Sequence, residues 1–97
     1  MITEIVRFTI APGIDRDEVI RRFETTMPAW QANEKLVRKY YLFDEETRQG
    51  GGVYLWPDKA AAQAAHNEEW CDRAEKLYGS RPTFEYFDTP CIVDNSG

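Results

Sequence analysis

The order of strand-like and helix-like patterns is the feature that most constrains this fold. Four segments have the side-chain alternation of strands: residues 2–10, 35–43, 51–56 and 83–93. One helical segment follows the first strand, and another follows the third. The order β-α-β-β-α-β predicts an α+β, ferredoxin-like fold, in which a four-stranded antiparallel sheet carries both helices on one face. We expect residues 1–97 to form a single domain.

The expected helix ends come from capping residues. The first helix should begin after Asp15, with Glu18 placed to complete a capping box, and Pro28 should end or kink it near Met27. The second helix should begin after Asp58 and end at Gly79. We expect this helix to break at Asn67, a second N-cap. Two acid-before-base pairs predict its solvent face: Glu69 with Arg73, and Asp72 with Lys76.

A single layer of helices leaves one face of the predicted sheet uncovered. The strand patterns suggest that Val6, Phe8 and Ile10 point one way. The large side chains expected on the other face are Ile5, Tyr41, Tyr54 and Trp56. An uncovered apolar face of this size favours a partner, and a second copy of the same sheet is the simplest one. We therefore expect a homodimer, assembled as a dimeric α+β barrel.

Charge and cysteine use exclude several function classes. The net charge of -5, from 17 acidic and 12 basic residues, argues against nucleic acid as a partner. The first ten residues contain Glu4 and Arg7, so they resemble neither a signal peptide nor a membrane span. We expect a cytoplasmic protein with no membrane partner, in which Cys71 and Cys91 stay reduced. Two cysteines and one histidine without metal-ligand spacing predict no metal site.

Three consecutive glycines, Gly50 to Gly52, precede a predicted strand. A phosphate-binding loop needs its glycines after a strand and before a helix, so that function is disfavoured. Glycines in a strand allow a bulge or a close approach of another group. They should either make room for a neighbouring chain or open space at one end of a cavity.

The segments "GGVYLWPDKAAAQA", "EEW" and "LYGSRPTFEYFDTPCIVDN" resemble the YdhR-like mono-oxygenases of the dimeric α+β barrel superfamily, the fold of antibiotic-biosynthesis mono-oxygenases. The resemblance covers most of the chain and is densest from Gly51 to Asn95. It implies a small homodimer whose two sheets form a barrel. It also implies a mono-oxygenase that acts on an aromatic or polyketide-type small molecule with O₂, and that needs no metal or other cofactor.

Two other branches of the superfamily fit less well. The haem-degrading branch uses an Asn, a Trp and a His, and the matching positions here are Arg7, Ala65 and Glu75. Haem degradation is therefore disfavoured. The polyketide-cyclase branch places its histidine near the helix break, whereas His66 lies about a turn before that position. A cyclase or isomerase acting in the same cavity remains an alternative, as does a non-enzymatic dimeric small-molecule-binding protein.

The candidate catalytic residues are a base and a charge partner. His66 is the histidine of the chain, and its ordinary pKa near neutrality suits a general base. The alternative is that His66 only packs beside the Asn67 cap. If His66 is not the base, we expect it among Tyr40, Tyr41 and Tyr54, of which Tyr41 is the catalytic candidate. Arg7 or Arg38 would stabilise an enolate or phenolate, unless each pairs with a neighbouring acid.

The candidate substrate-binding residues are mainly aromatic. Phe23, Trp30 and Trp70 would form walls that stack on a flat substrate, and the Tyr54 hydroxyl would orient it. Arg38 is included as a charged contact. The alternative for these aromatic side chains is a purely structural place in the core or the dimer interface.

Overall fold

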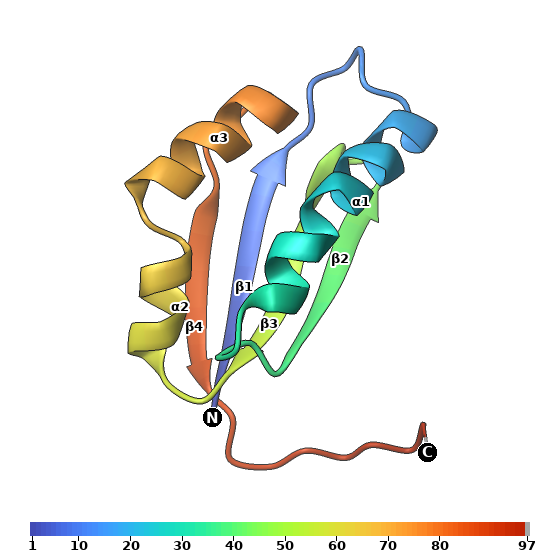
Figure 1. Ribbon diagram of the computed structural model, residues 1–97. Coiled ribbons are helices and arrows are strands. Elements are labelled where there is room, and N and C mark those ends of the chain that lie inside the picture. Colours follow the sequence, from blue (N-terminus) through green and yellow to red (C-terminus); the bar gives the residue numbers. More distant parts are fainter. Residues whose placement is uncertain (97) are drawn as a thin grey trace.

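The computed structural model describes residues 1–96. Within them the strands are β1 (Ile2–Thr9), β2 (Arg38–Asp44), β3 (Gln49–Trp56) and β4 (Thr83–Asp88), and the helices are α1 (Arg16–Ala32), α2 (Lys59–Ala65) and α3 (Glu68–Tyr78). The strands form one antiparallel sheet in the order β2-β3-β1-β4. All three helices cover the same face of this sheet (Figure 1). The predicted ferredoxin-like α+β fold is confirmed.

The helix ends follow the capping residues, with one exception. The Asp15 carboxylate accepts a hydrogen bond from the Glu18 N–H at 2.9 Å, which starts α1 as predicted. Pro28, however, lies inside α1, and the helix continues to Ala32. The expected end near Met27 is wrong. The extra turn carries Trp30 onto the sheet, where its ring packs 5.1 Å from that of Tyr54, and this packing offsets the hydrogen bond that proline removes.

The predicted break in the second helical segment is present and separates α2 from α3. The Asp58 carboxylate accepts from the Ala61 N–H, and the Asn67 side chain accepts from the Trp70 N–H, at 2.8 and 2.9 Å. Gly79, with a φ of 103°, ends α3 in the left-handed conformation. The two predicted ion pairs along α3 do not form. Arg81 instead binds the acidic side chains of this helix: Glu68, Asp72 and Glu75.

Strand register corrects the predicted division of side chains between the two faces. Tyr54 lies opposite Glu4, and Tyr41 lies opposite Gly52, which itself pairs with Val6. Tyr41, Tyr54 and Trp56 therefore share the helix-covered face with Val6, and the expectation that they point away is wrong. The uncovered face still presents apolar side chains: Ile5, Tyr40, Leu42, Val53, Leu55 and Phe87.

The chain beyond β4 leaves the sheet. The last strand ends at Asp88 rather than at the predicted residue 93, consistent with Pro90 lacking the N–H that a ladder needs. The tail then runs past the end of the sheet toward the start of β2 (Figure 1). There, the Asp94 Oδ2 lies 3.7 Å from the Arg38 Nη1. Val93 is 86% exposed, so the tail adds little to the core of its own chain.

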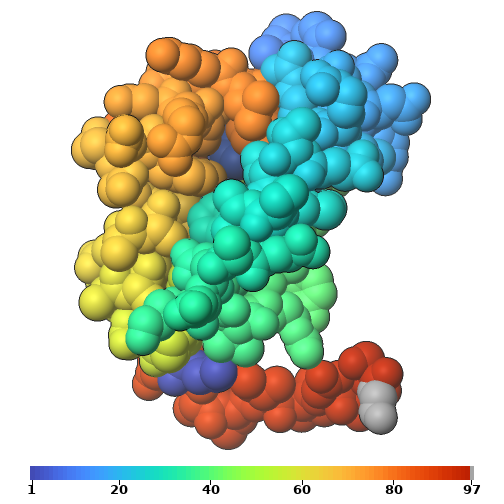
Figure 2. Space-filling view, viewed as in Figure 1, coloured from blue at the N-terminus to red at the C-terminus, as the bar shows by residue number. Residues whose placement is uncertain are grey.

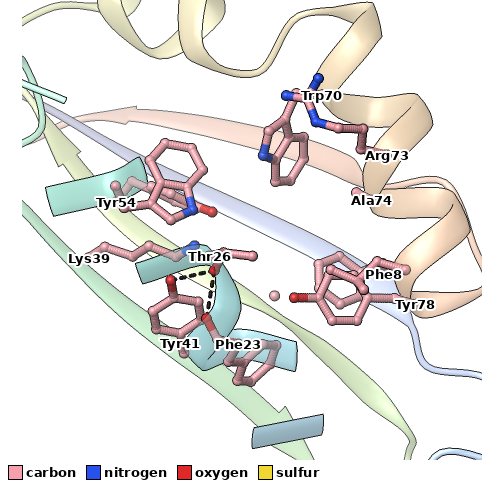
Figure 3. Close-up of a pocket in the computed structure, with 13 residues that line it drawn as sticks. Phe8, Phe23, Thr26, Lys39, Tyr41, Tyr54, Trp70, Arg73, Ala74 and Tyr78 are labelled. Carbon is pink, nitrogen blue, oxygen red and sulfur yellow. Dashed lines mark hydrogen bonds between the residues drawn. The ribbon is translucent and has the colours of Figure 1, made fainter. Parts of the chain in front are cut away.

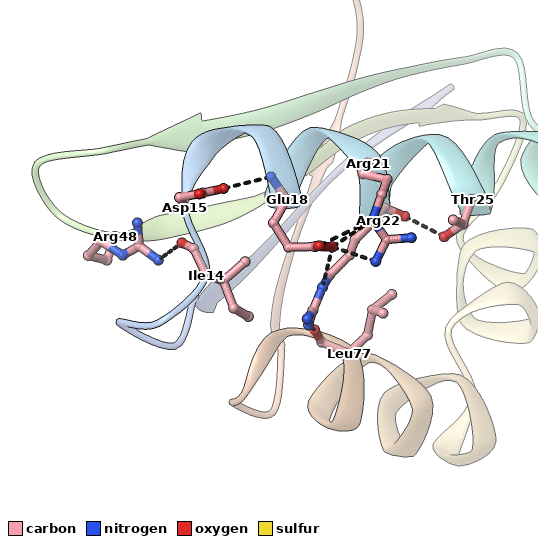
Figure 4. A network of polar contacts seen from close by, with 8 residues as sticks. All are labelled: Ile14, Asp15, Glu18, Arg21, Arg22, Thr25, Arg48 and Leu77. Carbon is pink, nitrogen blue, oxygen red and sulfur yellow. Dashed lines mark hydrogen bonds and ion pairs between the residues drawn. The ribbon is translucent and has the colours of Figure 1, made fainter.

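One arginine links α1 to the end of α3. Arg22 donates to the Glu18 carboxylate on its own helix and to the backbone carbonyl of Leu77 on α3 (Figure 4). The carbonyls at a helix C-terminus lack partners within the helix, so a guanidinium there satisfies one of them. This contact sets the distance between α1 and the C-terminal end of α3. Within residues 1–96, none of the helices has the length and hydropathy to cross a membrane.

Two of the three glycines, Gly50 and Gly51, permit the close packing of β1 and β3. Gly51 has a φ of 151°, and a Cβ there would lie 1.8 Å from the Val6 carbonyl oxygen. A Cβ on Gly50 would lie 2.7 Å from the Ile10 side chain. The glycines thus serve packing within one chain, next to the cavity described below.

We expect Gly51→Ala to lower the free energy of unfolding by at least about 2 kcal/mol, because it combines a backbone collision with a φ that side chains disfavour. Gly13→Ala is the matched control, since nothing lies within 4 Å of a Cβ there. It should change the free energy of unfolding by no more than about 0.5 kcal/mol. Urea denaturation measures both, and equal midpoints for the two variants would contradict this account.

Candidate functional site

A cavity of about 160 Å³ lies between the sheet and helices α1 and α3. In the space-filling view an opening separates α1 from α3, and the dark blue of β1 is visible at its base (Figure 2). The side chains around the cavity come from both layers of the fold (Figure 3). They are Phe8, Phe23, Thr26, Trp30, Lys39, Tyr41, Tyr54, Trp70, Arg73, Ala74, Leu77 and Tyr78, with Gly51 from the backbone of β3.

Five of the eight predicted site residues meet in this cavity. They are Phe23, Trp30, Tyr41, Tyr54 and Trp70. They come from α1, β2, β3 and α3, so the fold brings together residues from nearly half of the chain. Trp30 lies at the centre of the group, with ring centroids 5.1 Å from Tyr54 and 6.1 Å from Trp70. The result is a largely aromatic wall with a few polar groups.

His66 lies behind this wall. Its Nδ1 is 2.9 Å and 3.0 Å from the two carboxylate oxygens of Glu4, which also accepts a hydrogen bond of 2.9 Å from Trp56 Nε1. The imidazole is fully buried, and its Nε2 has no partner within residues 1–96. The rings of Trp30 and Trp70 pack against it at 5.2 and 4.4 Å between centroids.

This placement bears on the predicted role of His66. The histidine supports residues that line the cavity but is not itself among them. A general base must come within hydrogen-bond reach of the proton it takes. His66 does not line the cavity, and the rings of Trp30 and Trp70 pack against it, so its catalytic role stays a prediction. The packing alternative agrees with the observed geometry.

The two predicted arginines do not reach the cavity. Arg7 lies on the uncovered face of the sheet and pairs with Glu85, because alternation along β1 turns it away from the helices. Arg38 lies on the same face and donates to the Tyr40 hydroxyl at 3.2 Å. The charge partner expected from Arg7 or Arg38 is therefore not supplied by either residue in this cavity.

The tyrosines of the cavity are hydrogen-bond donors rather than bases. Burial raises the pKa of Tyr41, whose hydroxyl is 2.7 Å from that of Thr26. Burial raises the pKa of Tyr54 well above its ordinary value, and the nearby negative charge of Glu4 adds to the effect. Tyr78 has a raised pKa for the same main reason. A protonated phenol suits the orientation of a substrate oxygen, so the prediction of Tyr41 as the base loses support.

Sequence reasoning missed two cations at this site. Lys39 extends along the cavity wall, and burial lowers its pKa to about 7 against the opposing attraction of Glu4. Lys39 and Tyr41 lie two residues apart on β2 and therefore share one face of the sheet. This spacing could have predicted that Lys39 lies beside the cavity. Arg73 is exposed on its helix, as predicted, and it also lies at the edge of the cavity beside Trp70 (Figure 3).

Comparisons with known proteins support the fold. No protein-family model and no curated protein sequence matches the chain. Among solved structures, a Nitrosomonas europaea protein of unknown function, NE2512, has a TM-score of 0.75 at 18% identity, over 99% of this chain and 95% of that one. An antibiotic biosynthesis monooxygenase has a TM-score of 0.71 at 16% identity, over 92% and 98%. A variant of SnoaB, a cofactor-independent oxygenase from Streptomyces nogalater, has a TM-score of 0.67 at 19% identity, over 95% of each chain.

At this level of identity the similarity establishes a shared fold and nothing finer. The chain has the four-stranded, ferredoxin-like architecture of these mono-oxygenase-type structures. The resemblance to the YdhR-like branch in particular stays a prediction. Within the described residues, no three His, Cys, Asp or Glu side chains are grouped so that they could hold a metal ion.

The pKa of Lys39 predicts a pH dependence of stability. The folded value is about 7, whereas the unfolded chain has the ordinary lysine value of about 10.4. Between these values the unfolded state binds more protons. The contribution of Lys39 to stability therefore falls as pH falls through this range, and below it the full penalty of burying the charge is present.

Replacing Lys39 by the uncharged methionine removes that penalty. We expect Lys39→Met to raise the free energy of unfolding by at least about 1 kcal/mol near pH 6, and the gain to shrink toward about pH 10. Lys35→Met, at an exposed lysine of the same segment, is the control and should have little effect at either pH. Urea denaturation at both pH values tests this, and an equal gain at both would contradict it.

Proposed function

We propose that this protein is a mono-oxygenase that inserts one oxygen atom of O₂ into a small, electron-rich aromatic compound bound between the sheet and helices α1 and α3. The observation that carries the proposal is the cavity itself. Its walls are mostly aromatic, and its polar groups include protonated tyrosines and an amine of lowered pKa. The shared fold with an antibiotic biosynthesis monooxygenase and with the oxygenase SnoaB adds support.

The volume of the cavity narrows the substrate class. A cavity of about 160 Å³ is close to the engineered cavity of about 150 Å³ that binds benzene in another protein. A single aromatic ring therefore fits within the cavity, whereas a polycyclic polyketide would extend out through the opening between α1 and α3 (Figure 2). We infer a monocyclic phenol or hydroquinone as the substrate.

The chemistry needs electrons, and this substrate class can supply them. A hydroquinone and O₂ give a hydroxyquinone and water: one oxygen atom enters the ring and the other leaves as water. Deprotonation raises the electron density of the ring and prepares it for attack on O₂. The protein holds the ring against the wall that Trp30 and Trp70 form, orients its oxygen through tyrosine hydroxyls, and keeps water from the reacting carbon.

An isomerase or cyclase is the second candidate. It would use the same cavity and also need a proton acceptor beside hydrogen-bond donors, and Lys39 with Tyr41 and Tyr54 fits that need as well. The two candidates differ in one requirement, since only the oxygenase consumes O₂.

Methylhydroquinone is a suitable probe, incubated with the protein under air and under argon. We expect the hydroxylated quinone under air, at a rate above that of a protein-free control, and none under argon. Trp30→Ala should reduce the rate by about tenfold or more, because it removes the wall that positions the ring. Ile20→Ala, at an exposed position of the same helix, is the matched control. Equal turnover under argon would favour the isomerase, and no turnover would favour a binding protein.

We also propose that the protein is a homodimer that pairs through the uncovered face of the sheet. That face carries exposed apolar side chains, of which Tyr40 is 55% and Phe87 51% exposed. The tail, with Ile92 and Val93 exposed, is placed to extend the contact. Such an apolar surface is unusual for a monomer.

Light scattering should therefore give about twice the chain mass of 11.3 kDa. Tyr40→Glu places a charge in the proposed interface and should shift the mass toward the monomer. Glu24→Gln, on the exposed side of α1, should leave the mass unchanged. A wild-type protein that stays monomeric at micromolar concentration would contradict the dimer.

A further inference from the structure

Lys39 is an amine without an anionic partner inside the cavity. Its Nζ lies 3.9 Å from the ring centroid of Tyr41, 4.5 Å from that of Trp30 and 4.6 Å from that of Tyr54. Among the ion pairs and side-chain hydrogen bonds formed within residues 1–96, none involves this amine. Taking an amine out of water without an ion-pair partner costs free energy, so this position is unfavourable for stability alone.

The sheet leaves room for Lys39 at a glycine. A Cβ on Gly52 would lie 3.2 Å from Lys39 Cε and 2.9 Å from the Tyr54 ring. Because glycine has none, the lysine side chain lies across β3 and ends among the aromatic rings. The backbone therefore accommodates the side chain at the cavity wall, where it is partly buried.

Other charged and titratable groups face the amine from β1, β2, β3 and α3. They are Tyr41 on β2, Tyr54 on β3, Arg73 and Tyr78 on α3, and Glu4 on β1. The tyrosines have raised pKa values and keep their protons. A guanidinium does not give up its proton in a protein. Glu4 is turned to Trp56 and His66. Lys39, with a pKa of about 7, is the cavity group that exchanges a proton near neutral pH.

We propose that Lys39 is a catalytic residue that takes the proton from an acidic hydroxyl of the substrate and then binds the resulting phenolate as an ammonium ion. The O–H bond of the phenol breaks, an N–H bond forms, and the electron pair stays on the oxygen. No electrons are transferred in this step. The aromatic faces around Nζ stabilise the new ammonium, and the phenolate supplies the counter-ion that the free cavity lacks.

This assignment rests on the cavity being the substrate site of the proposed function, and it specifies the chemistry of that site. It replaces His66 and Tyr41 as the base, and Arg7 as the charge partner, with one group that performs both tasks. It also commits the site to ligands with an ionisable hydroxyl on a single ring.

The test uses 4-nitrophenol, whose colour changes on ionisation and whose pKa lies near neutrality. At a pH where the free probe is mostly protonated, adding the wild-type protein should produce the phenolate absorbance, saturating at one probe per chain. Lys39→Met should weaken this phenolate signal by about tenfold or more in apparent affinity. Lys35→Met, which alters an exposed lysine, should behave as the wild type.

A second probe separates this proposal from the proposed function. 4-Nitrotoluene has a similar shape and no ionisable proton, so the wild type and Lys39→Met should bind it equally. That result also establishes that the variant keeps its cavity. A phenolate signal that persists in Lys39→Met, or a wild type that binds 4-nitrotoluene but never ionises 4-nitrophenol, overturns the role of Lys39 while the cavity stands. Binding of neither probe by the wild type overturns the cavity as a substrate site, and the proposed function with it.

Discussion

The buried carboxylate of Glu4 is the interaction on which the arrangement of this molecule depends. It lies on the central strand β1, is completely removed from solvent, and receives Trp56 Nε1–H from β3 and His66 from the junction of α2 and α3. A buried carboxylate without partners would be strongly destabilising. Glu4 therefore fixes where the helix break meets the sheet. Since His66 packs against Trp30 and Trp70, the same contact sets the position of the cavity wall.

The fold could be predicted from the sequence because it depends on local signals. Asp15, Asp58 and Asn67 start helices through hydrogen bonds to backbone groups a few residues away, and Gly79 ends one through its own conformation. Pro28 shows the limit of such signals, because packing of α1 on the sheet kept the helix intact beyond it. The side chains of β3 were assigned to the wrong face for a related reason. Alternation separates two faces, but only pairing between strands decides which of them meets the helices.

Part of the candidate site could likewise be predicted from local sequence patterns, and part could not. Phe23, Trp30 and Trp70 could be found because large aromatic side chains at helical spacing tend to face the sheet, and the sheet forms the floor of the cavity. The chemical properties of Lys39 could not be found locally. Alternation with Tyr41 places Lys39 on the face of that tyrosine, but its lowered pKa depends on burial, and the rings of Trp30 and Tyr54 beside it come from other elements. His66 was a candidate base because its ordinary pKa lies near neutrality. In the structure its Nδ1 instead lies within hydrogen-bond distance of the Glu4 carboxylate.

The place of Lys39 above Trp30 has an optical consequence. Indole emission responds to a charge held close to the ring, and the amine lies 4.5 Å from the ring centroid. Trp56 is instead tied to Glu4 through its Nε1–H. We therefore expect the intrinsic fluorescence of the native protein to contain a component, from Trp30, that responds to the protonation of Lys39. That component would make the ionisation state of the cavity visible without an added label.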